Sequence, residues 1–271
     1  MLMLALATQA QTADEVEKRI ANLPAAERAY ERFRFWFTQL PPDQQRGPDN
    51  QDRYRTYLKQ RGFADAEVDS QLKLIEEQGQ HSEVARWNQI LTAERPAFNI
   101  NPNEFLVQMA KGRKPGTALD VGMGQGRNTI WLAQQGWDTT GFDPAEKAVA
   151  LARENAAKLS VRIHTEIKGS EDFDFGERHW DLILVSYVSL RGDEAKLMRA
   201  LKPGGVVIVE GFHRDATKGR SIGSGVVFDT GELVKLFSGL RVVRYEEPVG
   251  KPDFGSGTMR VVRYCGERVA E

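Results

Sequence analysis

The sequence predicts an α/β protein in which a doubly wound, mostly parallel sheet of seven strands follows a helical segment. After residue 117, short apolar runs alternate with stretches of helical spacing, as in chains that cover both faces of a parallel sheet with helices. Between residues 12 and 95 the spacing is helical throughout and is interrupted only at prolines and glycines. Both observations describe one α/β domain with an appended helical region.

Seven runs have the length and apolar character of strands, and helical stretches follow several of them. The expected strands are 117–122, 137–142, 161–166, 180–186, 205–210, 240–247 and 259–266, and the expected helices are 125–135, 144–158, 193–201 and 229–237. No helical stretch separates the last two strands, so we expect them to form an antiparallel hairpin at one edge of the sheet.

The region before the sheet is expected to contain four or five helices. Thr12 and Glu15 match a capping box, which marks the start of the first one. Residues 28–40 carry a dense set of aromatic side chains, for which we favour core packing over a substrate pocket. We therefore divide the chain into a helical extension or lid, 1–97, and an α/β domain, 98–271.

Composition excludes several classes of function. With a net charge of −1 and basic residues spread along the chain, no nucleic-acid footprint is expected. No stretch is long enough to span a bilayer. Cys265 is the single cysteine, and neither an H-E-x-x-H nor a C-x-x-C pattern occurs, so we expect no metal site.

The first ten residues allow two interpretations. Residues 2–7 are apolar and are followed by Thr-Gln-Ala, which resembles the end of a secretion signal. The run is short and lacks a positively charged start, so a frayed terminus is the alternative.

A glycine-rich turn follows the first expected strand. Residues 118–128 read Ala-Leu-Asp-Val-Gly-Met-Gly-Gln-Gly-Arg-Asn. Glycine permits positive φ angles and lets a ligand approach the backbone closely. The helix expected from residue 125 directs unpaired N–H groups at the same point, which favours an anionic or carboxylate-bearing ligand. The second strand ends at Asp143, whose carboxylate can accept hydrogen bonds from both hydroxyls of a ribose. A nucleoside ligand is therefore expected.

The spacing of the glycines distinguishes two kinds of cofactor. A dinucleotide motif, G-x-G-x-x-G, would need glycine where this chain has Arg127. The pattern D-x-G-x-G-x-G is met in full, and here the chain resembles the class I S-adenosylmethionine-dependent methyltransferases. Three further segments match that family in order and spacing: Asp143-Pro144, Trp180 to Val185, and Leu201 to Glu210. The resemblance covers roughly residues 98 to 266. Gly-Arg-Asn with the later Gly-Trp-Asp-Thr-Thr-Gly-Phe-Asp is most similar to the small-molecule branch that includes tellurite-resistance and thiopurine-type methyltransferases.

The resemblance implies a Rossmann-like fold, S-adenosylmethionine as the cofactor, and transfer of its methyl group to an oxygen, nitrogen or sulfur of a small-molecule acceptor. It implies that Asp120 and the glycine turn hold the methionyl end and that Asp143 holds the ribose. A capping carboxylate on the following turn is the alternative role for Asp120. The residues implied in cofactor binding are Asp120, Gly122, Met123, Gly124, Gly126, Asn128, Asp143, Pro144, Ser170, Glu171 and Asp172.

The adenine contact departs from the family pattern. Relatives place an acidic residue two positions before a Glu-Asp-x-x-Phe stretch, and this chain has Gly169 there. The exocyclic amine is then expected at Ser170, Glu171 or Asp172, while Phe142 or Pro144 packs against the ring. A solvated acidic loop is the competing interpretation.

Acceptor-facing residues are expected beyond the fourth and fifth strands, because ligands of open α/β sheets bind at the carboxyl ends of the strands. This selects Tyr187, Glu210 and His213, with Tyr187 and His213 as the candidate catalytic residues. The imidazole of His213 can accept a proton near neutral pH, although a loop histidine without a role is as consistent. The segment 185–188 lacks the Asn-Pro-Pro-Tyr signature of methylases that act on bases or glutamine.

Trp87 and Phe98 are candidates to close over the cofactor, with burial alone as the alternative. Two other functions stay open: a protein that binds the cofactor without turnover, and an NAD(P)-dependent oxidoreductase, which Arg127 disfavours. The cofactor is made in the cytoplasm, so we expect a cytoplasmic protein, or an exported one if residues 1–10 are a leader.

Overall fold

The computed structural model describes residues 12–41, 44, 50–218, 220 and 222–269, so residues 1–10, with their two interpretations as a leader or a frayed terminus, lie outside the described residues. The chain forms two compact units, one up to Ala85 and one from Arg86 onward. Each has its own core, and each is described separately below.

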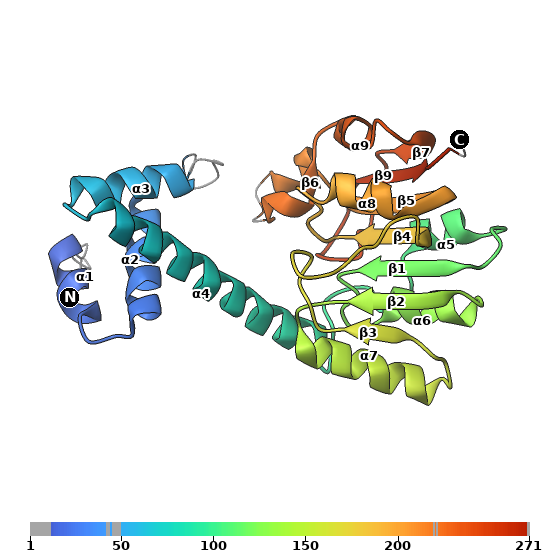
Figure 1. The fold of residues 1–271 in the computed structure, drawn as a ribbon, viewed down its shortest axis with the longest axis horizontal. Helices are drawn as coiled ribbons and strands as arrows, with labels where there is room; N and C mark the ends of the chain where they lie inside the picture. The colour runs from blue at the N-terminus through green and yellow to red at the C-terminus, as the bar shows by residue number, and fades with distance from the viewer. Residues whose placement is uncertain (1–11, 42–43, 45–49, 219, 221, 270–271) are drawn as a thin grey trace, which may run out of the picture. The chain divides into compact units, whose positions relative to one another are not determined.

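The first unit is helical, as expected. Its described residues form α1 (Ala13–Ile20), α2 (Ala25–Gln39), α3 (Asn50–Gln60) and α4 (Asp65–Leu91), whose residues from Arg86 belong to the second unit (Figure 1). The capping box at α1 is confirmed: the Glu15 amide donates to Thr12 Oγ1 over 3.3 Å, and the Thr12 amide donates to Glu15 Oε2 over 2.8 Å.

The aromatic face of α2 packs within this unit. Trp36 and Tyr54 are buried, and the rings of Phe33 and Tyr54 meet edge to face with centroids 5.1 Å apart. Arg32 beneath them is 8% exposed and donates to Glu17 and Gln71. The aromatic residues therefore build a core, which is the interpretation that the sequence favoured.

The second unit contains the expected sheet, in the order β3-β2-β1-β4-β5-β9-β7. Strands β1 to β5 pair in parallel, and β9 runs antiparallel between β5 and β7 (Figure 1). Two short strands that the sequence did not suggest, β6 and β8, pair with β5 and β9. The strands are β1 (Thr117–Val121), β2 (Asp138–Phe142), β3 (His164–Glu166), β4 (Trp180–Ser186), β5 (Leu201–His213), β6 (Val227–Phe228), β7 (Arg241–Glu246), β8 (Val249–Gly250) and β9 (Met259–Glu267).

Helices cover both faces of this sheet. In β1, in β4 from Leu182 and in β5 from Val206 to Val209, the even-numbered residues face α5 and α6 and the odd-numbered residues face α8 and α9, because successive strand side chains point to opposite faces. The seven-residue α5 was not expected from the sequence. The helices are α5 (Glu104–Ala110), α6 (Arg127–Gln134), α7 (Glu146–Lys158), α8 (Glu194–Ala200) and α9 (Glu232–Leu236).

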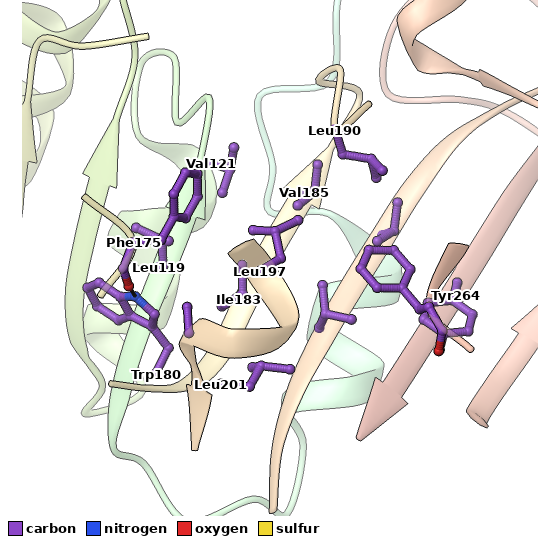
Figure 2. Packing of buried hydrophobic residues seen from close by; sticks show 14 of the residues in the cluster. Leu119, Val121, Phe175, Trp180, Ile183, Val185, Leu190, Leu197, Leu201 and Tyr264 are labelled. Carbon is purple, nitrogen blue, oxygen red and sulfur yellow. Dashed lines mark hydrogen bonds between the residues drawn. The ribbon is translucent and has the colours of Figure 1, made fainter. Parts of the chain in front are cut away.

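The two faces bury separate apolar cores. Figure 2 shows the larger one, in which Ile183 and Val185 of β4 lie beside Leu197 of α8. The smaller one joins α5 and α6 to the sheet and includes Cys265, which is fully buried. These cores hold the strands in register, so the carboxyl ends of β1, β2, β4 and β5 meet along one edge.

The contribution of the larger core to stability can be tested at Ile183, which lies in the middle of the sheet. We expect Ile183→Ala to lower the free energy of unfolding by about 2–5 kcal/mol, since it removes fully buried methyl groups from the middle strand of the sheet. Urea unfolding followed by circular dichroism measures the change. Val243→Ala, at a side chain that is 43% exposed on β7, is the control and should change stability by under about 0.5 kcal/mol.

Candidate functional site

The glycine turn leaves β1 with three left-handed residues. Gly122, Gly124 and Gly126 have φ angles of +67°, +53° and +83°, a region that other residues enter at a cost. A Cβ on Gly122 would overlap Val188, and one on Gly126 would lie 2.9 Å from the Cβ of Ala152. The glycines are therefore required by backbone conformation and by close packing, as the motif predicted.

Asp143 ties this turn to the end of β2. Its Oδ2 accepts a hydrogen bond from the Gly124 amide over 2.9 Å, and its Oδ1 accepts one from the Ala145 amide over 2.8 Å. Burial raises the pKa of the carboxyl group, while these two bonds lower it. A carboxylate has about four acceptor positions, so two remain for the two hydroxyls of a ribose. These residues fit the ribose end of an adenosyl cofactor.

Asp120 lies on β1 below the turn and is 2% exposed. Its Oδ2 accepts a hydrogen bond from Thr129 Oγ1 over 2.6 Å. Burial raises the pKa of Asp120 to about 6, although the Thr129 bond and the charge of Arg127 lower it. Burial therefore outweighs the groups that favour the charged form of Asp120.

Three other predicted cofactor residues have different surroundings. Met123 is buried against Gly141, and its amide donates to the Phe142 carbonyl over 3.0 Å. The side-chain oxygen of Asn128 accepts from the Asn103 amide over 2.8 Å. Pro144 is exposed after β2.

The acidic loop after β3 places a carboxylate over its glycine. A Cβ on Gly169 would lie 2.5 Å from both carboxylate oxygens of Glu171. Ser170 is half-buried, whereas Glu171 and Asp172 are exposed. Phe142 stacks on Phe173 with ring centroids 4.1 Å apart, so its ring faces the core on that side.

Tyr187 follows β4 with a φ angle of +58°, which is unusual for a bulky residue. Its hydroxyl accepts a hydrogen bond from the Asp253 amide over 3.3 Å, and its ring packs edge-on against Phe212. Burial, with the neighbouring Glu210 and Asp253 carboxylates, raises the pKa of Tyr187 above its ordinary value of 10. The phenol is therefore neutral at physiological pH.

His213 ends β5, and both of its ring nitrogens have partners. Nδ1 accepts a hydrogen bond from the Asp215 amide over 3.0 Å and caps the short 3-10 helix that follows. Nε2 lies 3.0 Å from Thr230 Oγ1, which donates to Glu247 over 3.1 Å. This pattern assigns the ring proton to Nε2.

A buried polar network that sequence reasoning missed crosses the carboxyl edge. Asn103 is fully buried, and its Nδ2 donates to Glu210 Oε1 and to Asp253 Oδ2 over 2.8 Å each. Asp253 Oδ2 also pairs with Arg127 over 2.7 Å, and Glu210 pairs with Arg263 over 2.5 Å. Asn103 is the N-cap of α5, a helix that the sequence did not suggest, and Asp253 carries no motif.

The last turn of α4 and the segment after it lie against the turn and Asp143. Asn88 accepts from the Lys147 amide and donates to Glu146, both over 2.9 Å, at the start of α7. A Cβ on Gly124 would lie 3.3 Å from Leu91, which clusters with Ala145, Ala148 and the side chains of Trp87 and Phe98. Phe98 in turn stacks on Phe254 with centroids 5.2 Å apart.

Methyltransferases are similar to the part of the chain that carries this site. Residues 118–205 match the model of a methyltransferase domain. An uncharacterised methyltransferase of Synechocystis sp. is 31% identical over 143 residues, which are 47% of this chain and 64% of the relative. A probable S-adenosyl-L-methionine-dependent methyltransferase of Haemophilus influenzae, TehB, is 34% identical over 76 residues, 26% of this chain and 27% of the relative. These matches therefore span about a quarter to just under two thirds of the curated relatives.

Solved structures share the fold. TehB of Haemophilus influenzae superposes with a TM-score of 0.54 at 20% identity, covering 61% of this chain and 62% of that one. The N-methyltransferase NodS of Bradyrhizobium japonicum, in complex with S-adenosyl-L-homocysteine, gives 0.54 at 19% identity over 68% of this chain and 97% of that one. Over residues 118–205 the chain therefore resembles methyltransferases, among them one described as probably S-adenosyl-L-methionine-dependent, and its α/β unit has the fold of TehB and NodS.

Helical membrane spans and metal clusters are both absent from the part of the chain that the structure describes. No described helix is long and apolar enough to cross a membrane. Within the same residues, histidine, cysteine and acidic side chains form no group of three that could hold a metal ion.

The raised pKa of Asp120 predicts a pH dependence of stability. Asp120 has a higher pKa in the folded protein than the ordinary value of 3.8, so its ionisation costs stability as the pH rises from about 4 through about 6. Asp120→Asn stays neutral, so we expect its stability to gain on the wild type across this range, by on the order of 3 kcal/mol at pH 7. Urea unfolding at pH 4 to 8 measures the difference between the two curves, with the exposed Asp138→Asn as the control. A pH-independent difference would contradict the assignment.

Asp253 is expected to be the costliest residue of the buried network to remove. Asp253→Ala would leave the donors of Asn99, Asn103 and Arg127 buried without their acceptor, at a cost of about 3–5 kcal/mol. Denaturant titration gives the value. Asp229→Ala breaks the exposed pair with Arg214 and should cost about 0–1 kcal/mol. Equal effects of the two substitutions would show that the network contributes no more than a surface pair.

Proposed function

We propose that this protein transfers the methyl group of S-adenosylmethionine to an oxygen, nitrogen or sulfur atom of a small-molecule acceptor. The observation that carries the proposal is the glycine turn with three positive φ angles, held by Asp143 at the shared edge of β1 and β2. When bound, the cofactor supplies an electrophilic methyl group on a sulfonium, so the protein mainly orients the reactants and excludes water.

Each end of the cofactor has candidate partners in this chain. Asp143 retains acceptor capacity for the ribose hydroxyls, and the turn with Asp120 is suited to the methionyl end. For the adenine, we favour Glu171 over Ser170 and Asp172, because its carboxylate lies over Gly169, where relatives carry an acidic side chain. In this chain, Glu171 would supply the carboxylate for the adenine from a position two residues after Gly169.

The acceptor side is proposed to lie by Tyr187 and His213. The raised pKa of Tyr187 supports orientation of the acceptor by a neutral hydroxyl and argues against proton removal by a phenolate. His213 would have to release the Asp215 amide before Nδ1 could accept a proton. We therefore assign both residues to positioning of the acceptor. The acceptor that fits such a site best is a good nucleophile that loses its proton to water and needs no protein base.

The segment from Trp87 to Phe98 is proposed to cover the cofactor. Its support is the contact of Leu91 with Gly124 and the attachment of Asn88 to the first residues of α7, next to Asp143. In keeping with the cytoplasmic synthesis of the cofactor, we propose that the protein acts in the cytoplasm.

Calorimetric titration tests the cofactor site. We expect micromolar binding of S-adenosylmethionine and S-adenosylhomocysteine and none of NADH. Asp143→Ala should weaken S-adenosylhomocysteine and 5′-methylthioadenosine alike, by at least about tenfold, because both carry the ribose and a charged hydrogen bond contributes about 1.5–3 kcal/mol. Asp138→Ala, at the exposed start of the same strand, should change neither.

Turnover needs a separate readout. Release of S-adenosylhomocysteine during a screen of small oxygen, nitrogen and sulfur nucleophiles would support transfer. Cofactor binding without release for any acceptor would favour a binding protein, and binding of NADH alone would favour an oxidoreductase.

A further inference from the structure

One buried hydroxyl at the carboxyl edge of the sheet has no hydrogen-bond partner among the described residues. This is Ser186 Oγ, at the last position of β4, in a residue that is 7% exposed. A buried hydroxyl without a partner loses its bonds to water and gains nothing in return. Such a group at a ligand-binding edge indicates a partner that arrives with the ligand.

The register of the sheet places Ser186 beside the glycine turn. Strands β1 and β4 pair as far as Val121 and Val185, so Gly122 and Ser186 are the next residues of the two strands. Ser186 shares its parity with Leu182 and Leu184, which face α5 and α6. Its hydroxyl therefore lies on the face of the sheet that also carries Asp120.

Two carboxylates flank this hydroxyl on the neighbouring strands. Glu210, directly opposite Ser186 on β5, is neutralised by Arg263 and bonded by Asn103. Asp120 on β1 accepts hydrogen bonds from the hydroxyl and the backbone amide of Thr129, but it forms no ion pair among the described residues. Because no cation pairs with Asp120 directly, its negative charge favours a cationic donor on this side of Ser186.

We infer that Ser186 Oγ accepts a hydrogen bond from the ammonium group of the cofactor's methionyl part, beside the carboxylate of Asp120. This rests on the proposed function and adds to it a residue that selects the amino-acid end of the ligand. The ammonium satisfies the buried hydroxyl and compensates the charge of Asp120 in one contact. Ser186 is thus a specificity residue for an adenosyl ligand that carries an amino acid.

Two ligands that differ in that amino acid test the inference. S-adenosylhomocysteine carries the ammonium, and 5′-methylthioadenosine lacks it but keeps the adenosine and the thioether. We expect Ser186→Ala to weaken S-adenosylhomocysteine roughly ten- to hundredfold in calorimetric titration and to change 5′-methylthioadenosine less than about twofold. Ser186→Cys, which keeps the side chain small and replaces the hydroxyl by a weak acceptor, should behave in the same way.

A second buried hydroxyl provides the control. Thr139 Oγ1, near the start of β2, also has no partner among the described residues, but it lies away from the carboxyl edge. Thr139→Val should leave the binding of both ligands unchanged. The ligand-free Ser186→Ala protein should melt at or above the temperature of the wild type, because the unpaired hydroxyl is gone.

The outcomes separate this inference from the function beneath it. Unchanged affinity of Ser186→Ala for S-adenosylhomocysteine, or an equal loss for both ligands, would overturn the assignment of the ammonium contact while leaving a cofactor site in place. A wild-type protein that binds neither ligand would overturn the proposed function itself.

Discussion

The carboxylate of Asp143 is the constraint on which the functional edge depends. It accepts one amide from the glycine turn and one from the residue before α7, so a single side chain joins the ends of β1 and β2 to the start of a helix. Both bonds go to backbone groups, so they fix where the chain runs. The turn can hold three left-handed glycines in place because its middle amide is bonded to this buried acceptor.

A second layer of polar groups lies along the same edge, where β4 and β5 end. Asn103, Asp253 and Glu210 come from three distant parts of the chain, and each is nearly or fully buried. Their charges are matched by Arg127 and Arg263, so this layer is close to neutral as a whole. Buried ion pairs add little stability compared with apolar side chains in the same place. Leaving one of their charges buried without its partner, however, strongly lowers the stability of the fold. The network therefore selects one arrangement of the loops that border the site.

The sequence predicts the glycine turn and the strands around it well, because their determinants are local. Alternating glycines, the aspartate ending a strand and the strand and helix periods all lie within about 25 residues, where spacing translates directly into geometry. The parallel core strands and the antiparallel final pair were confirmed on this basis. From the sequence, Arg127 indicated only that the third glycine of a dinucleotide motif is absent. In the structure, Arg127 forms a buried ion pair with Asp253.

Long-range pairings explain what the sequence did not reveal. Asn103 and Asp253 are 150 residues apart, and neither has a neighbour that marks its partner. The helix α5 is too short for a periodic pattern, and β6 and β8 are two residues each. Strand β3 is shorter than expected, and β5 extends back through Gly204 and Gly205, where its register with β4 shifts. Such features arise from tertiary contacts that override local preference.

The burial of Cys265 has a practical consequence. It is the only cysteine of the chain, it lies on β9 and is fully buried between the sheet and the helices, and burial raises the pKa of its thiol to about 11. A thiol that is neither accessible nor ionised reacts slowly with alkylating reagents. Cys265 should therefore not interfere with site-directed labelling. A cysteine introduced at an exposed position would carry the only fluorophore or spin label, so Cys265 would not have to be replaced first.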